Sequence, residues 1–409
     1  MTRTAVRQQS RGGETRPFVM LGLIAVVELL GMSGWFAGGA LAHQLAAAWS
    51  LSASEMAWLT SAVQLGFVVG TLVAAVLNLA DLVPARWLVA TAALGASAAN
   101  ASLLVVDSFG GALVTRFLLG LCLAGVYPPA MKMAATWFKD RRGFAIGVVV
   151  GALTIGKASP YLVEALGGLS LTIVVGSTAV GAAVAGVLVG VAYRDGPFGF
   201  PARPFSWRLV GQVAGLADLR LVTAGYLGHM WELYAFWSFV AAYWAAALVN
   251  PAPTTVAVLA GSSIAIGALG CVGGGLAADR LGRERVVLWS LAISGIAAIG
   301  SALVFHGPGW LRLVVIMVWG IAIIADSAQY SALVTELAPA HAVGTALTLQ
   351  TSLGFLLTMV AIQMVAALGG PATPWAFPAL AVGPALGFVA IRAVAKRRWS
   401  EPGSPPSLP

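Results

Sequence analysis

Three carboxylates stand alone inside long apolar stretches of this sequence: Glu28, Glu232 and Asp326. The first two lie in similar contexts, VVELLGM and MWELYAF, about 200 positions apart. A charged side chain at the depth of a bilayer costs at least ~2.5–3.5 kcal/mol, so such residues usually face a water-filled path or a partner. Burial also disfavours the ionised form of a carboxyl, which lets it load and release a proton near neutral pH. The duplicated carboxylate therefore indicates two related halves around a cavity that handles charge.

Other polar and aromatic residues are expected near these carboxylates. His229 precedes Glu232 by three positions and shares its helix face, where it can relay a proton or contact a solute. A structural ion pair or a neutral hydrogen-bonded carboxyl is the alternative for each acid, and packing is the alternative for the histidine. We expect the wall of the cavity to include Trp35, Tyr127, Lys132, Lys157, Trp231, Phe236 and Gln329.

Composition places the chain in a membrane. The 409 residues are 59% hydrophobic, their mean hydropathy is +0.90, and only 9% are charged. Soluble domains are ~45–50% apolar, and a helix of about 20 apolar residues crosses a bilayer. The net charge of +8 reflects basic residues beside the apolar segments, so membrane topology explains it better than nucleic-acid binding. Cys122 and Cys271 lie in apolar stretches and are expected to be packing residues.

We predict an all-α membrane protein of twelve transmembrane helices in two pseudo-symmetric six-helix halves. The first six helices are placed at 18–42, 55–80, 86–106, 111–138, 143–167 and 169–192. The second six are placed at 221–248, 255–278, 286–305, 312–335, 342–368 and 374–395. The predicted organisation is an N-tail (1–17), a first half (18–192), a linker (193–220), a second half (221–395) and a C-tail (396–409).

The distribution of basic residues predicts the orientation. Most of the 23 Lys and Arg fall in the tails, the linker and alternate loops, which this topology places on one side. Cytoplasmic segments carry such an excess, so both tails and the linker are expected in the cytoplasm and the chain in the cell membrane. Glu28 lies 10 residues past Phe18, or roughly 15 Å at 1.5 Å per residue, and therefore approaches the midplane.

Two motifs carry a resemblance to a known family. The loop GGGLAADRLGRERV at 273–286 and the run TRFLLGLCLAG at 115–125 resemble signatures of the major facilitator superfamily. The resemblance implies an inner gate in which Asp279 pairs with Arg280 or Arg283. The first-half counterpart LNLADLVPARWL keeps Asp81 and Arg86 but lacks the glycine-arginine core. The family resemblance also implies that Arg116 handles protons or substrate charge.

The segments GVYPPAMKMAATWF and RRGFAIGVVVGALTIGKASPY resemble the branch of this superfamily near the nitrate/nitrite porters. Those porters hold their anion with an arginine in helix 2 and another in helix 8. The corresponding ranges here, 55–80 and 255–278, contain neither Arg nor Lys, which argues against nitrate as the substrate. The helix-5 signature of drug antiporters is also incomplete, because Ala152 follows Gly151 where proline is expected.

The sequence contains no nucleotide-binding loop, catalytic constellation or Cys/His metal cluster, so we expect neither an enzyme nor a cofactor. Energy must then come from a gradient. We predict a monomeric, proton-coupled secondary transporter of a small organic solute or anion that works by alternating access, with helices 1, 4, 7 and 10 lining the cavity as the family resemblance implies. The alternatives are a drug or metabolite efflux antiporter and a non-transporting membrane sensor.

Overall fold

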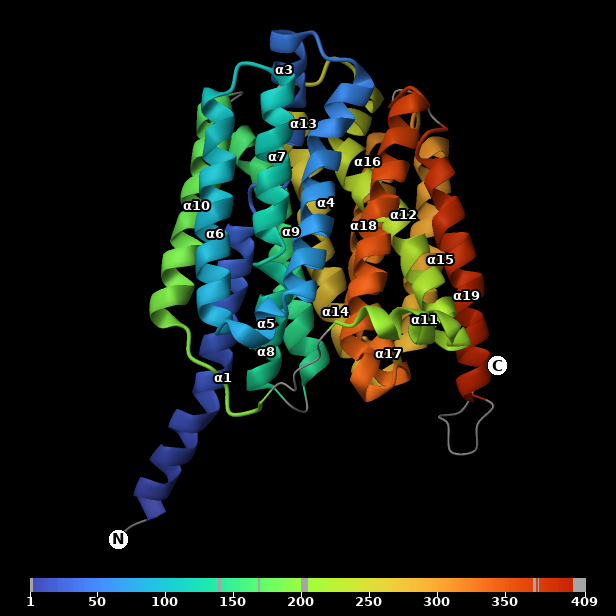
Figure 1. Ribbon diagram of the computed structural model, residues 1–409. Coiled ribbons are helices and arrows are strands. Elements are labelled where there is room, and N and C mark those ends of the chain that lie inside the picture. The colour runs from blue at the N-terminus through green and yellow to red at the C-terminus, as the bar shows by residue number, and fades with distance from the viewer. Residues whose placement is uncertain are drawn as a thin grey trace.

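The computed structural model describes residues 3–138, 141–167, 170–199, 205–370, 373 and 375–399. Within these residues every regular element is a helix, and the helices stand side by side as an upright bundle (Figure 1). The first and last described residues lie at the same end of the bundle, as the charge distribution predicts for two tails on one side. The all-α membrane fold expected from the sequence is confirmed.

The first half of the chain forms eleven helical segments. They are α1 (Arg3–Gly31), α2 (Ala37–Ala40), α3 (Ala42–Trp49), α4 (Ala53–Val76), α5 (Leu79–Leu82), α6 (Ala85–Ala101), η1 (Ser102–Val105), α7 (Phe109–Leu123), α8 (Tyr127–Trp137), α9 (Arg142–Gly167) and α10 (Leu171–Ala192). A short helix, α11 (Trp207–Gly215), lies within the predicted linker.

The second half repeats this plan. Its segments are α12 (Ala217–Ala247), α13 (Pro253–Ala265), α14 (Gly267–Leu281), α15 (Arg283–Leu303), α16 (Gly309–Ala325), α17 (Ser327–Leu337), η2 (Ala340–Ala342), α18 (Val343–Ala367), η4 (Pro378–Ala381) and α19 (Val382–Trp399). The bounds of the two halves and of the tails remain predictions from the sequence.

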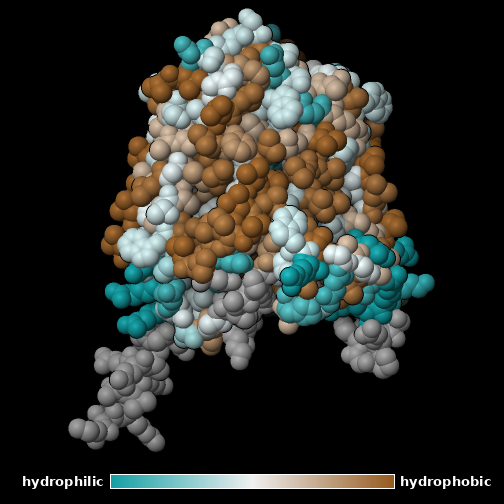
Figure 2. Space-filling model, viewed as in Figure 1, coloured by the Kyte–Doolittle hydropathy of each residue, from teal (hydrophilic) through white to brown (hydrophobic). Residues whose placement is uncertain are grey.

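Ten helical stretches of the described residues are long and apolar enough to cross a membrane. The long helices α1 and α12 are not among these ten, and they are the two that carry Glu28 and Glu232. Apolar side chains dominate the middle of the outer surface, and hydrophilic ones gather at the end where the termini lie (Figure 2). These observations support a multi-pass membrane protein, while a count of exactly twelve spans stays a prediction.

Several predicted helices are interrupted rather than continuous. The predicted helix 111–138 divides into α7 and α8 just before Pro128 and Pro129, where proline removes backbone donors and bends the chain. The predicted helix 312–335 divides at Asp326, between α16 and α17. The two interruptions fall about 200 positions apart, so the helices that correspond in the two halves break at corresponding places.

Close helix crossings repeat in the same way. A Cβ atom on Gly120 of α7 would lie 2.0 Å from the Val63 carbonyl oxygen of α4. A Cβ atom on Gly320 of α16 would lie 2.2 Å from the Ser263 carbonyl oxygen of α13. Only glycine permits such contact, so the two matched glycines set equivalent crossings. Gly120 and Gly320, which lie 200 positions apart in the sequence, therefore occupy corresponding places in the two halves.

Candidate functional site

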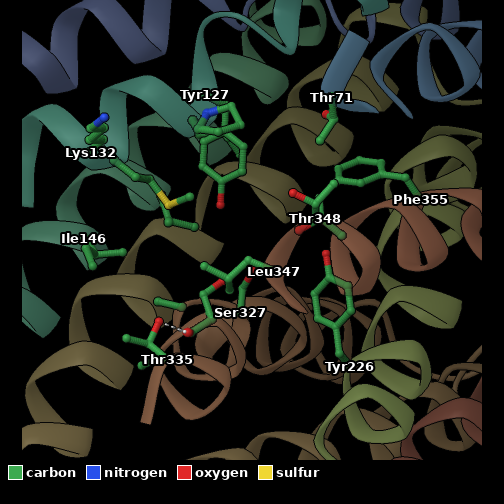
Figure 3. A pocket seen from close by; sticks show the side chains of 18 of the residues that line it. Thr71, Tyr127, Lys132, Ile146, Tyr226, Ser327, Thr335, Leu347, Thr348 and Phe355 are labelled. Carbon is green, nitrogen blue, oxygen red and sulfur yellow. Dashed lines mark hydrogen bonds between the residues drawn. The ribbon is translucent and has the colours of Figure 1, made fainter. Parts of the chain in front are cut away.

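The two halves enclose a cavity of about 580 Å³. Its wall is mostly apolar but carries hydroxyl groups, and those of Tyr127 from α8 and Tyr226 from α12 point into the space from opposite sides (Figure 3). The exposed Glu336 of α17 also lines it, so the cavity reaches the surface at the end where the termini lie. A small solute can therefore enter from that side and meet hydroxyl donors and acceptors in an otherwise apolar space.

Contacts between the halves close the opposite end. Ser54 Oγ donates to Gln363 Oε1 at 2.9 Å, and Thr358 Oγ1 donates to Gln64 Oε1 at 2.6 Å, both between α4 and α18. Below them the rings of Phe67 and Phe355 lie 4.5 Å apart between centroids. Nearer the termini the same two helices separate, since both contribute residues to the cavity wall. The cavity is therefore open at the end where the termini lie and closed at the opposite end.

Lys157 of α9 lies in an aromatic cage above the cavity. Its ammonium is 4.0 Å from the ring centroid of Trp35, 4.4 Å from that of Tyr234 and 5.1 Å from that of Trp237. It also donates a hydrogen bond to the Tyr234 hydroxyl. Lys157 and Trp35 belong to the first half and the other two rings to α12, so this buried cation joins the two halves.

Glu28 of α1 is the acidic group that acts electrostatically on Lys157. The two side chains are not within ion-pair distance, and neither carboxylate oxygen of Glu28 has a hydrogen-bond partner among the described residues. The helices meet closely here, because a Cβ atom on Gly156 would lie 2.3 Å from the Leu29 carbonyl oxygen. Glu28 is thus a fully buried carboxyl on which the caged Lys157 ammonium acts electrostatically.

Arg116 of α7 is also fully buried, but it is bound by backbone oxygens. Its guanidinium donates to the carbonyl oxygens of Gly34 at 3.0 Å and Leu59 at 3.3 Å, and to that of Trp35. It also reaches Asn100 Oδ1 at 3.5 Å. These acceptors lie in the break between α1 and α2 and on neighbouring helices, which explains why the predicted helix 18–42 is not continuous. Arg116 therefore holds the Trp35 backbone in place rather than facing the cavity.

His229 and Asp326 form a buried pair in the second half. Nδ1 of His229 lies 2.9 Å from Oδ1 of Asp326, and both side chains are almost completely buried. The imidazole is flanked by the rings of Tyr226 and Tyr330, at 6.1 and 5.5 Å between centroids. Tyr226 also lines the cavity, so this pair is in contact with a residue of the cavity wall. The structure brings together two residues that the sequence placed on different helices.

Glu232 faces the interior of the second half instead of the cavity. Its Oε1 accepts from Ser294 Oγ at 2.6 Å, and its Oε2 accepts from Trp319 Nε1 at 3.2 Å. Both donors are buried, on α15 and α16. Glu28 and Glu232 have similar sequence contexts, but their side chains are not in contact. Glu232 is instead held by a hydrogen-bond network within its own half.

The remaining residues expected on the cavity wall divide into three groups. Tyr127, Lys132 and Gln329 line the cavity. Trp35 and Lys157 lie behind its upper wall, in the aromatic cage. Trp231 and Phe236 face away from it.

Trp231 and Phe236 lie on the side of α12 that faces away from the cavity, where neighbouring helices of the second half pack against them. Trp231 Nε1 lies 3.5 Å from the Ala379 carbonyl oxygen, and Phe236 packs at 4.5 Å between centroids against Trp319. Helical periodicity alone could not separate the two faces of α12, since aromatic residues cover both.

The inner-gate residues make contacts different from those the family resemblance implies. Nε of Arg283 pairs with Glu336 Oε1 at 2.6 Å, and its Nη1 donates to Gln329 at 3.1 Å. Arg398 joins the same cluster through Glu336 at 3.1 Å and Glu284 at 2.7 Å. This cluster ties α15, α17 and α19 within the second half rather than bridging the halves.

The other gate residues form no such cluster. Asp279 is exposed at the end of α14, and a Cβ atom on Gly143 of α9 would lie 2.5 Å from its Oδ1. Arg280 is exposed and takes part in no ion pair with another described residue. The guanidinium carbon of Arg86 lies 4.9 Å from the Trp87 ring centroid. The side chain of Asp81 lies outside the described residues.

Sequence reasoning missed the pairing of Lys157 with Tyr234. Glu164 follows Lys157 by two turns on the same helix, but no ion pair among the described residues involves it. The partner is instead a tyrosine 77 positions away on α12. The aromatic richness of that helix was the available signal, and nothing in the local sequence linked it to the lysine.

Comparisons with known proteins agree with the helical plan. The family model described as Major Facilitator Superfamily matches residues 23–362. A solved structure of a bacterial homolog of the human lysosomal transporter Spinster, in an inward-facing and occupied conformation, is similar with a TM-score of 0.68 and 14% sequence identity. The similarity covers 93% of this chain and 97% of that one. No curated protein matches the chain significantly.

Proposed function

Because the chain belongs to the major facilitator superfamily, we propose that it is a proton-coupled secondary transporter of a small organic solute or anion. The observation that carries this proposal is a cavity between the halves with buried ionisable groups beside it. Alternating access would exchange the α4–α18 contacts at the closed end for new contacts at the open end, by rocking 1–192 against 221–409. We further propose that it acts as a monomer in the cell membrane, with both termini cytoplasmic.

The proton site we favour is Glu28, with the His229–Asp326 pair as the second candidate. Glu28 has no described hydrogen-bond partner, so a proton can bind there without breaking a network. Tyr127 lies close enough to interact electrostatically with Glu28, and its hydroxyl points into the cavity (Figure 3). The hydroxyl provides a route for the proton between the cavity and the carboxyl. Glu232 is a weaker candidate because two donors already hold its oxygens.

The test is proton movement driven by a solute. Full-length protein is reconstituted into vesicles that contain a pH-sensitive dye, and candidate organic acids, amino acids, sugars and amines are added outside. A transported solute should acidify the interior in wild type but not in Glu28→Gln, whereas the matched control Glu164→Gln, which changes another buried carboxyl of the first half, should behave as wild type. Solute uptake without any proton movement in wild type would refute the coupling.

The apolar and aromatic wall of the cavity favours a second candidate, an antiporter that exports a drug or metabolite. Tyr226, Tyr234, Trp237 and Phe355 all contribute to that wall, and such surfaces accept hydrophobic solutes. The same vesicles separate the two functions. In antiport, the interior becomes more alkaline when solute enters, because each solute exchanges for a proton.

A further inference from the structure

The Lys157 cage has a property that the transport proposal does not use. The buried ammonium contacts three rings and one hydroxyl, and no described carboxylate lies within ion-pair distance of it. Aromatic faces and a neutral hydroxyl stabilise a cation only in part, so an ammonium in such a site retains affinity for an anion. The cage is therefore an incomplete anion-binding site.

The wall between this ammonium and the cavity is thin. Tyr234 and Trp237 contact Lys157 and also line the cavity. A carboxylate that displaced the Tyr234 hydroxyl would form a hydrogen bond in which both partners are ionised, and it would add a Coulomb attraction that the neutral hydroxyl lacks. Phe355, Met230 and Leu153 lie along the same part of the wall, so the body attached to this carboxylate would be apolar.

At this site the positive charge of the proton would compensate the negative charge of the bound anion. An ionised Glu28 in the empty site would balance the positive charge of an ionised Lys157. Protonation of Glu28 would remove its negative charge and leave the ammonium available to a bound anion. The titratable groups that face the pair are Tyr127 from α8 and Tyr234 from α12, while α10, which also packs on α1, contains none.

We propose that the substrate is an organic monoanion with an apolar body, that Lys157 leaves its aromatic cage to bind the carboxylate, and that a proton on Glu28 accompanies it. This inference rests on the proposed transport function. It predicts electroneutral symport, because the loaded site carries the same net charge as the empty one. A single uncompensated charge would make transport respond to the membrane potential by ~2.3 kcal/mol per 100 mV, or roughly fiftyfold.

The experiment measures ligand stabilisation of purified full-length protein. Hexanoate, benzoate and phenylacetate are each compared with the corresponding amide at pH 5.5 and 7.5. At least one carboxylate should raise the melting temperature while its amide does not, and the effect should be larger at pH 5.5. Lys157→Gln should weaken this binding by roughly ten- to hundredfold, because it removes a charged hydrogen bond. Lys157→Arg should retain the preference for the anion.

Lys396→Gln is the matched control, since it removes an exposed lysine on α19 and should leave anion binding unchanged. Glu28→Gln imitates the protonated acid, so its stabilisation by the carboxylate should be equal at the two pH values. This variant keeps the proposal testable if Lys157→Gln does not fold. The proposal is overturned if no carboxylate stabilises wild type, if amides stabilise equally, or if Glu28→Gln retains the pH dependence of wild type.

The vesicle assay separates this inference from the proposed function. If neutral or cationic solutes move protons and anions do not, the transporter is proton-coupled but the assignment of Lys157 is wrong. If anions bind through Lys157 but no proton accompanies their uptake, the anion site stands and the proton coupling fails.

Discussion

Replacing Glu232 with leucine should destabilise the protein more than the same replacement of Glu28. Glu232 accepts hydrogen bonds from Ser294 and Trp319, and both donors are buried. Leucine would leave the buried Trp319 N–H without an acceptor, and Ser294 would keep only its longer bond to the Leu291 carbonyl oxygen, at 3.3 Å. Each of the two lost bonds costs about 1–3 kcal/mol, so the loss in the free energy of unfolding is about 2–6 kcal/mol.

Glu28→Leu is the matched control, because it removes the same side chain from the corresponding position of the first half. It leaves no described donor unsatisfied and removes only the electrostatic effect of Glu28 on Lys157. We therefore expect a loss of stability less than half as large. Transport should show the opposite order, since Glu28→Leu abolishes proton movement.

The measurement is thermal unfolding of the two variants and wild type in the same detergent. Unfolding entropy is about 2.1 cal/mol/K per residue, or about 0.9 kcal/mol/K for 409 residues. The loss expected for Glu232→Leu then lowers the melting temperature by about 2–7 °C. An equal decrease in both variants, or no decrease in Glu232→Leu, would refute the assignment of Glu232 to a structural network.

Three further predictions concern the helix packing around the site. Arg116→Gln should lower the free energy of unfolding by at least about 3 kcal/mol, because several buried carbonyls lose a charged donor. Chemical unfolding measures this free energy, and a loss below about 1 kcal/mol would contradict the prediction. Gly120→Ala should lower the free energy of unfolding in the same assay by about 1–3 kcal/mol or more, because the helices at this crossing must separate. Gly22→Ala is the control and should change it little, because a Cβ atom there meets nothing within 4 Å. The third prediction concerns a disulfide formed by Ser54→Cys and Gln363→Cys in a background without the native cysteines. It should stop transport in vesicles until a reductant is added, because it prevents the closed end from opening. Transport at the wild-type rate in the oxidised protein would show that this end need not open.

The sequence by itself determined the class of fold. Apolar runs of membrane-spanning length, basic residues on one side, and the motif at 273–286 are local or additive features, and none depends on how the helices pack. The recurrence of a carboxylate at Glu28 and Glu232, about 200 positions apart, also indicated two related halves. The first helix interruption has a local cause, because Pro128 and Pro129 lack backbone donors, although the predicted helix 111–138 was continuous.

Only the tertiary structure decided what each carboxylate does. Glu28 and Glu232 each precede a leucine within an apolar stretch, but the groups that surround them come from other helices. Ser294 and Trp319 surround Glu232, whereas Glu28 lies near Lys157. A helical side chain has no preference of its own among buried faces, and the packing of both halves sets its partners. The contact of Lys157 with Tyr234 exists only because two half-bundles meet at that level, so no local pattern could have predicted it.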